Sequence, residues 1–397
     1  MKLANRIIKV KPSSTLALVA KEKDLKAQGK DIIGFGAGEP DFDTPEHIKQ
    51  ACIKGLNSGN TKYNPTEGQK RLREIIASRL KSEYNLDYGF ENVIVSCGAK
   101  HSLFNVILAV CQENDEVIIP SPYWVSYVEM VNLAGAVPVF VDTLASGFKL
   151  TPQALTKAIT ARTRAIFLNY PSNPTGAVMS RNELAAIAQV LVKHPEIMII
   201  SDEIYDKLIF DGLKNTSIAQ ISEAVKKQTV IVNGVSKTYA MTGWRIGWLT
   251  APLDIAKACG KLQSHQTSGP VSFAMDGAYA ALASDQTCVE TMRQAFEKRR
   301  NLLVDLLNNI PGIKCPVPQG AFYVFPQISD LLGKSFNGRE LATPDQFAEA
   351  LLDSEGVVVV PGEGFGSDRH VRLSYATSES LIEKGVSKIA AFVKKLL

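Results

Sequence analysis

Between residues 93 and 251 the chain alternates short apolar segments with amphipathic ones, and no other feature of the sequence limits the fold as much. Seven segments rich in apolar or β-branched residues span 93–96, 116–120, 137–141, 164–169, 197–202, 229–233 and 245–251. Helical patterns, such as those over 151–159 and 180–192, fill the gaps. Buried strands joined by helical crossovers predict a mainly parallel, doubly wound sheet. An irregular linker precedes the last segment, so this strand could run antiparallel to the others.

The two flanks of this region have different patterns. Before it, Thr44-Pro45-Glu46 predicts a helix with Thr44 as its N-cap and Gly59 at its end, and a long amphipathic stretch follows over 69–84. After about residue 285, one long helical pattern runs to 309. Beyond it we expect strands at 321–325, 357–360 and 370–375, and helices at 344–354 and 380–396. This last part predicts a smaller α+β unit.

Composition excludes several classes of protein. Of 397 residues, 45% are hydrophobic and 21% charged, which excludes general disorder, and at this length we expect two domains. The net charge of +4 is too small to indicate a nucleic-acid partner. Short basic clusters such as Lys298-Arg299-Arg300 are interleaved with acidic residues, which favours solvated helix faces over a binding patch.

Cysteine, histidine and apolar runs bear on compartment and metal content. The six cysteines form no CxxC pair and the five histidines are dispersed, so we expect free thiols in a reducing cytosol and no metal site. The longest apolar runs, such as 197–200, are far shorter than the roughly 18 residues of a membrane span. Residues 1–14 lack the apolar core of a signal peptide. We therefore expect a cytoplasmic enzyme with no membrane partner.

The segment from Asn233 to Gly247 holds the first concentration of reactive side chains. Lys237 comes just after a predicted buried strand, where loss of water and cationic neighbours lower an amine pKa from about 10.4 toward neutrality. Such a lysine can form a Schiff base with an aldehyde cofactor. A surface ammonium is the ordinary alternative, but Ser236 and Arg245 can both bind a phosphate and favour the reactive interpretation.

Two more polar groups follow predicted strands. Asp202 ends the segment 197–202, and open α/β sheets bind ligands beyond the carboxyl ends of their strands. Its carboxylate could hold a protonated ring nitrogen of a cofactor, or it could cap the N-terminus of the next helix. Taken alone, this segment favours neither interpretation. Asn173 lies in a turn flanked by prolines that presents its amide to the same cleft. A plain turn would explain the prolines but not the asparagine.

Three weaker motifs point the same way. After the segment 93–96, Gly98-Ala99-Lys100 opens a helix whose N–H groups can cradle a phosphate, although such turns are common. Trp124 could stack on a cofactor ring, although a structural tryptophan is the commoner case. Arg372 lies in an alternating strand and is expected to point away from its apolar face. There its guanidinium would match a substrate carboxylate.

In their order along the chain these motifs resemble those of the fold type I pyridoxal-phosphate enzymes, and among them the class I aminotransferases. The resemblance runs through Gly36-Ala-Gly-Glu-Pro-Asp-Phe42, Tyr63-Asn-Pro-Thr-Glu-Gly68, Asn173-Pro-Thr-Gly176, Ser201-Asp-Glu-Ile-Tyr205, Ser236-Lys237 and Arg372-Leu-Ser-Tyr-Ala376. Lys11-Pro12-Ser13 and Ser121-Pro-Tyr-Trp-Val-Ser-Tyr127 are similar to the bacterial aspartate aminotransferase subgroup.

This resemblance implies pyridoxal 5'-phosphate as the cofactor and a role for each residue. Lys237 would carry the cofactor and move a proton between substrate and cofactor, and Asp202 would pair with the ring nitrogen. Tyr205 and Asn173 would hydrogen-bond the phenolic oxygen, while Trp124 would stack on the ring. The phosphate would be held by Ser236, Arg245, Gly98, Ala99 and Lys100.

For the substrate, the resemblance implies that Arg372 binds the α-carboxylate with the backbone of Gly38 against it, beside Trp124 and Asn173. Lys100 and Thr15 would bind the second carboxylate of a dicarboxylic substrate. The implied reaction is ping-pong transfer of the amino group from L-aspartate to 2-oxoglutarate. A prephenate or aromatic amino acid aminotransferase of the same subgroup is the alternative.

The same resemblance implies a fold, a domain division and a partner. We expect a large domain at 46–290, with a mainly parallel seven-stranded sheet between helices, and a small α+β domain built from 1–45 and 291–397. Tyr63 would reach the phosphate of a neighbouring subunit, giving a homodimer with shared active sites. A transcription regulator with an aminotransferase-like domain would need a preceding DNA-binding domain, which we do not expect because the motifs begin by residue 11.

Overall fold

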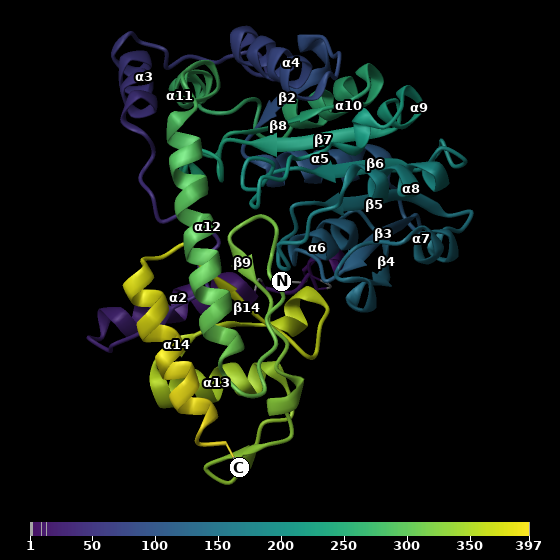
Figure 1. Cartoon of the computed structure of the whole chain (residues 1–397). Helices are drawn as coiled ribbons and strands as arrows, with labels where there is room; N and C mark the ends of the chain where they lie inside the picture. Colours follow the sequence, from purple (N-terminus) through teal and green to yellow (C-terminus); the bar gives the residue numbers. More distant parts are fainter. Residues whose placement is uncertain (1–2, 9, 13, 397) are drawn as a thin grey trace.

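The computed structural model describes residues 3–8, 10–12 and 14–396, and its centre is a sheet of seven strands (Figure 1). In chain order the strands are β2 (Val93–Ser96), β3 (Glu116–Ser121), β4 (Val137–Asp142), β5 (Thr163–Asn169), β6 (Met198–Asp202), β7 (Thr229–Gly234) and β8 (Gly247–Thr250). Across the sheet the order is β2-β8-β7-β6-β5-β3-β4. Only β8 runs antiparallel to its neighbours. The mainly parallel sheet is confirmed, and the direction left open for its last strand is antiparallel.

Helices cover both faces of the sheet because its strands are apolar on both sides. In β5, Phe167 faces the cluster formed with α5 (Ala99–Val110), α6 (Ser126–Leu133) and α10 (Leu253–Ser264). Its neighbours Ile166 and Leu168 face α7 (Pro152–Ala158) and α8 (Arg181–Leu191) on the other side. On that same side α4 (Lys70–Tyr84) and α11 (Ser272–Ala283) cover β7 and β8, and α3 (Glu46–Asn57) packs on α11. Successive apolar side chains thus alternate between the two faces, as expected for a sheet covered by helices on both sides.

The C-terminal third forms a smaller lobe together with the N-terminal segment (Figure 1). Its antiparallel sheet has the order β13 (Val360–Pro361), β14 (Val371–Ser374), β9 (Tyr323–Val324). It is surrounded by α12 (Thr287–Asn308), α13 (Pro344–Glu355) and α14 (Glu379–Val393). β1 (Ile33–Gly34) pairs in parallel with β12 (Val357–Val358), and α2 (Ser14–Ala27) contacts β13. Residues from both parts of the chain therefore share one lobe.

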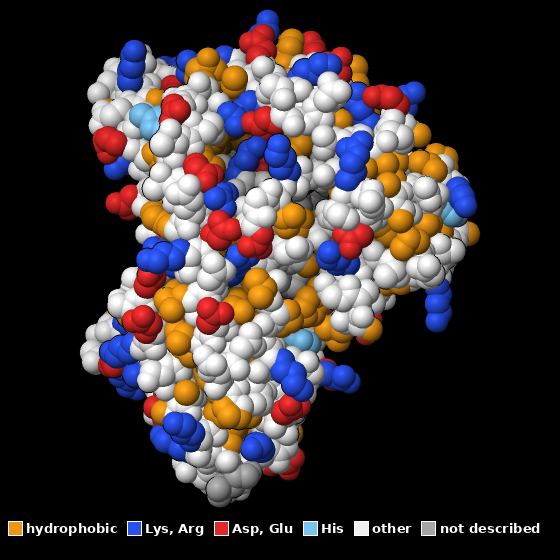
Figure 2. Space-filling model, in the orientation of Figure 1, with side chains coloured by type: hydrophobic (Ala, Val, Ile, Leu, Met, Phe, Trp, Pro, Cys, Tyr) orange, Lys and Arg blue, Asp and Glu red, His pale blue; other side chains and the backbone are white. Residues whose placement is uncertain are grey.

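The remaining elements are short. They are the helices α1 (Asn5–Ile8) and α9 (Glu223–Lys226), the hairpin strands β10 (Ser335–Phe336) and β11 (Arg339–Glu340), and 3-10 turns at Phe90–Asn92, Leu144–Ser146, Ile218–Gln220, Thr242–Trp244, Ser329–Leu331 and Gly362–Phe365. None of the helices in the described part of the chain is both long and apolar enough to cross a membrane. Over the face seen in Figure 2, cations and anions are interspersed.

Three expected boundaries were wrong. α3 has Pro45 at its N-cap position, and the Thr44 hydroxyl instead donates a hydrogen bond of 2.7 Å to the Ala240 carbonyl. The strand expected at 357–360 is divided between β12 and β13, which belong to different sheets. The last strand begins only at Gly247, because Arg245 ends a 3-10 turn with a φ of 58°, a conformation that no strand residue adopts.

Candidate active site

A cavity of about 450 Å³ lies beyond the ends of the central strands. Eleven of the fourteen predicted site residues line it: Gly38, Ala99, Lys100, Trp124, Asn173, Asp202, Tyr205, Ser236, Lys237, Arg245 and Arg372. The reason is topological, since β2, β5, β6 and β7 all end at this edge or just before these residues.

Three predicted residues lie elsewhere. Gly98 sits directly behind the cavity at the N-cap of α5. The side chain of Tyr63 is 97% exposed on the single chain. Thr15 belongs to α2, but its side chain lies outside the described residues.

Lys237 is held at the centre of this cavity. Its Nζ donates a hydrogen bond of 2.6 Å to the Gly38 carbonyl. Removal from water lowers the pKa of Lys237 to about 8; the Glu39 charge opposes this, while the charges of Arg245 and Arg372 add to it. A sizeable share of the amine is therefore neutral near physiological pH, as a nucleophile or a base requires.

Asp202 is buried at the end of β6, with a hydrogen-bond donor on each oxygen. The Tyr127 hydroxyl donates to Oδ2 at 2.6 Å, and the Ile204 N–H donates to Oδ1 at 3.3 Å. Burial raises the pKa of Asp202 to about 6, against these two hydrogen bonds and the Lys237 charge. An ionised carboxylate in such a place is stabilised by a cationic partner.

Tyr127 is a site residue that the sequence reasoning missed. It lies on α6, 75 residues before Asp202, and its ring stacks on Phe167 at 4.3 Å and meets the Trp124 ring edge-on at 5.4 Å. The only signal in the sequence was its place at the end of the segment Ser121-Pro-Tyr-Trp-Val-Ser-Tyr127. It links the predicted ring-stacking residue to the buried carboxylate.

At one end of the cavity the structure presents several donors that suit a phosphate. Gly98 has a φ of +85°, and a Cβ there would meet the Arg245 guanidinium. The first two residues of α5, Ala99 and Lys100, line the cavity together with the buried Ser236, and the first N–H groups of a helix have no acceptor within it. Arg245 itself donates at 2.7 Å to the Thr242 carbonyl, which holds its guanidinium near Gly98. A dianionic group would find backbone, hydroxyl and guanidinium donors together.

Arg372 is almost fully buried, at 2% exposed. Its Nη1 donates to Asn173 Oδ1 and its Nη2 to the Gly36 carbonyl, both at 3.0 Å. We expected this side chain to point away from the apolar face of its strand. Its guanidinium carbon instead lies 4.4 Å from the centre of the Tyr323 ring and 4.9 Å from that of Phe365. Its Nε has no hydrogen-bond partner in the described part of the chain. A buried cation with an unused donor is suited to binding an anion.

Lys100 supplies a second cation to the same cavity. Its Nζ lies 4.9 Å from the centre of the Trp124 ring. Partial removal from water and the charge of Arg245 lower the pKa of Lys100. An anion bound beside Lys100 would favour the charged amine and so oppose both effects.

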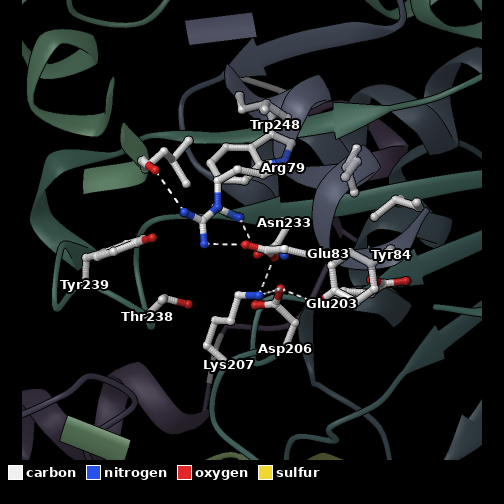
Figure 3. A pocket seen from close by; sticks show the side chains of 15 residues that line it. Arg79, Glu83, Tyr84, Glu203, Asp206, Lys207, Asn233, Thr238, Tyr239 and Trp248 are labelled. Carbon is white, nitrogen blue, oxygen red and sulfur yellow. Dashed lines mark hydrogen bonds and ion pairs between the residues drawn. The ribbon is translucent and has the colours of Figure 1, made fainter. Parts of the chain in front are cut away.

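A smaller cavity of about 40 Å³ lies behind the loops that carry these residues (Figure 3). Figure 3 shows the charged chain Arg79–Glu83–Lys207 beside Asp206, which ties the turn after β6 to α4. Glu203 is buried beside it, and burial raises the pKa of its carboxyl to about 7, against hydrogen bonds from Ser217 and Ser201. The ion pairs therefore fasten the residues that follow Asp202 to α4.

These donor groups fit pyridoxal 5'-phosphate: a buried carboxylate for the ring nitrogen, an amine of lowered pKa for the aldehyde, and a cradle at Gly98 for the phosphate. Comparison with known proteins bears on the same point. The model of the family "Aminotransferase class I and II" matches residues 30–389. The chain belongs to this family. The family and fold predictions are therefore confirmed, and this protein is a pyridoxal-phosphate-dependent aminotransferase.

Individual relatives match this chain over nearly all of both lengths. This aminotransferase is 49% identical to the aspartate aminotransferase of Bacillus subtilis, with all of both chains covered. It is 46% identical to the aspartate/prephenate aminotransferase of Cereibacter sphaeroides, over 98% of each chain. The structure of the Thermus thermophilus aspartate aminotransferase with maleate superposes with a TM-score of 0.92 at 41% identity, covering 98% of this chain and 99% of the other.

Proposed function

We propose that this aminotransferase transfers the amino group of L-aspartate to 2-oxoglutarate, giving oxaloacetate and L-glutamate. The observation that carries the proposal is the presence of two separate cations, Arg372 and Lys100, in the cavity that holds Lys237. All four of these compounds are dicarboxylates, and each needs one cation for its α-carboxylate and another for its second carboxylate. The relative from Bacillus subtilis carries the name of this activity.

When bound, pyridoxal 5'-phosphate supplies the electron sink that stabilises negative charge at the substrate Cα. Asp202, whose ionised form is favoured by the hydrogen bond from Tyr127, would hold the ring nitrogen protonated. Lys237 would hold the aldehyde group of the cofactor, and its amine, with a pKa of about 8, would be suited to moving the proton at the substrate Cα. Tyr205 and Asn173 would bind the phenolic oxygen, and Trp124 would stack on the ring.

The phosphate would be held by Ser236, Arg245 and the turn Gly98-Ala99-Lys100. The substrate α-carboxylate binds Arg372 beside Gly38, and Lys100 with Thr15 takes the second carboxylate. The buried position of Arg372 excludes water from this ion pair and strengthens it. Because the reacting carbon is fixed between two bound ends, the substrate is oriented before the proton moves.

A second candidate is transamination of prephenate. It is favoured by the relative from Cereibacter sphaeroides, whose name includes both activities. Prephenate also carries two carboxylates, so the two cations suit it as well as aspartate. One enzyme could therefore act on both.

We further propose a homodimer, located in the cytoplasm. The 97% exposure of the Tyr63 side chain supports the dimer, since a neighbouring subunit would cover it. The six cysteines, all within the described residues, are free thiols, as expected in a reducing compartment. The division into a large domain at 46–290 and a small domain from 1–45 and 291–397 is likewise a proposal, supported by the pairing of β1 with β12.

The test is to add single amino acids to the purified protein loaded with pyridoxal 5'-phosphate and to follow the cofactor absorbance. L-aspartate and L-glutamate should change the band within one turnover, and L-alanine should do so much more slowly. If phenylalanine changes the band but aspartate does not, the proposed substrate is wrong. Prephenate is tested in the same way in the second half-reaction, against 2-oxoglutarate.

A further inference from the structure

A second large cavity, of about 300 Å³, lies between the two lobes and apart from the cavity of Lys237. We call it the basic cavity. One wall comes from residues 144–149 and 175–177 of the sheet region, and the other from residues 314–319, 327 and 369–370 of the C-terminal part. Its volume is within the range of small-molecule sites.

The charge of the lining is one-sided. Lys149, Lys314 and Arg369 line the basic cavity, and no Asp or Glu does so among the described residues. Each cation has a carboxylate neighbour outside the lining: Glu183 at 3.0 Å, Asp330 at 2.9 Å and Asp368 at 3.5 Å, respectively. The last two pairs are more than half exposed and so contribute little. A multivalent anion can therefore compete for these cations.

His370 adds a buried donor to this lining. The residue is only 6% exposed, its ring stacks on Phe325 at 4.8 Å, and its Nδ1 lies 2.7 Å from Ser367 Oγ. Burial and the charge of Arg369 lower the pKa of His370 to about 4, so the ring is neutral. Ser367 Oγ accepts from the Arg369 N–H, so its own proton points to Nδ1. Nε2 then carries the ring proton, and it has no protein partner in the part described.

Besides the polar Thr175, Gln319 and Gln327, the rest of the lining is mainly apolar and includes Phe148, Pro316 and Val317. A ligand made only of charged groups, such as an inorganic ion, would leave this part of the surface unused. The lining suits an organic anion with a short carbon body and at least two acidic groups.

The basic cavity shares its walls with the catalytic one. On the turn after β5, Asn173 lines the cavity of Lys237 and Thr175 lines the basic cavity. Arg372 on β14 lines the cavity of Lys237, and His370, the residue just before β14, lines the basic cavity. Asn173 and Arg372 are joined by a hydrogen bond of 3.0 Å. A ligand that fixes Thr175 against His370 therefore also fixes the pair that binds the substrate carboxylate.

We propose that the basic cavity is an effector site for a small organic anion with two or more carboxylate or phosphate groups, and that its occupancy strengthens substrate binding. The bound anion bridges the lobes by contacting Lys149 on one wall and Lys314, Arg369 and His370 on the other. This favours the arrangement in which Arg372 and Asn173 are aligned. The binding half of the proposal does not depend on the substrate named above.

The test uses the holoenzyme, with citrate as the carboxylate probe, pyrophosphate as the phosphate probe, and sodium chloride to keep the ionic strength constant. Binding is measured by titration calorimetry, and the KM for 2-oxoglutarate is measured with and without each probe. The variant Lys314→Gln/Arg369→Gln removes two cations of the basic cavity. The matched control Lys193→Gln/Lys257→Gln removes two exposed lysines that form no ion pair within the described residues.

We expect at least one probe to bind wild type and control, with affinity about ten-fold lower for each cavity cation removed. The tighter probe identifies the acidic group. That probe should lower the KM about five-fold in wild type and control but not in the cavity variant. Three results would overturn the proposal: no binding of either probe, equal binding by the cavity variant, or a competitive rise in KM that is the same in all proteins. Binding with an unchanged KM would overturn its coupling to the substrate.

Discussion

Replacing Tyr127 with phenylalanine removes a single hydrogen bond from Asp202 and leaves the ring stack on Phe167 in place. The lost bond stabilises only the ionised carboxylate, so its removal raises the pKa of Asp202 above the value of about 6. A hydrogen bond to a charged group contributes about 1.5–3 kcal/mol. At about 1.4 kcal/mol for each pH unit, the titration of Asp202 moves up by about one to two pH units.

The assay is the pH dependence of cofactor binding to the apoprotein. Binding needs the ionised form of Asp202, so affinity falls as the pH drops through its pKa. In Tyr127→Phe this fall should begin about one to two pH units higher than in wild type. Tyr375→Phe is the matched control, because it removes a buried hydroxyl bonded to the Ala321 carbonyl, away from the cofactor cavity. Equal midpoints in wild type and Tyr127→Phe would refute the reasoning.

Three further substitutions test other parts of the site. Arg372→Lys loses the fork that binds Asn173 and Gly36, so kcat/KM should fall about 10²–10³-fold for both substrates in steady-state assays; a loss for only one substrate would contradict its role. Lys100→Gln should raise the KM for L-aspartate about ten-fold and leave that for L-alanine unchanged, and a parallel rise in both would be evidence against it. Gly98→Ala forces a Cβ toward Arg245 at a φ of +85°, so cofactor affinity should drop about ten-fold in equilibrium titration; full affinity would show that the turn adapts.

Much of the large lobe was predictable because its signals are local. Each strand of the sheet is a short apolar run, and Asp202 follows one such run directly, so the rule for strand ends placed it at the cleft without knowledge of the rest of the chain. The helical pattern over 180–192 is equally local and corresponds to α8, whereas the cap expected at Thr44 was wrong because its hydroxyl bonds the distant Ala240 carbonyl.

What the sequence did not reveal depends on contacts between distant segments. Tyr127 and Asp202 are 75 residues apart, and no local pattern predicts their hydrogen bond. The run 357–360 reads as one strand, but β12 pairs with β1 from the N-terminal segment and β13 pairs with β14. Arg245 leaves its expected strand because its turn lets the guanidinium reach Thr242 and Cys97 near Gly98. In each case tertiary contacts override local propensity.

Lys237 is proposed to move the proton in transamination of L-aspartate, and a single-turnover experiment tests this role most directly. Protein loaded with pyridoxal 5'-phosphate is mixed rapidly with L-aspartate, and the cofactor absorbance is followed in wild type and Lys237→Ala. Wild type should show a fast change that reverses on adding 2-oxoglutarate, and the rate in the variant should be lower by at least about 10²–10⁴-fold. An unchanged band in wild type, or an equal rate in Lys237→Ala, would contradict it.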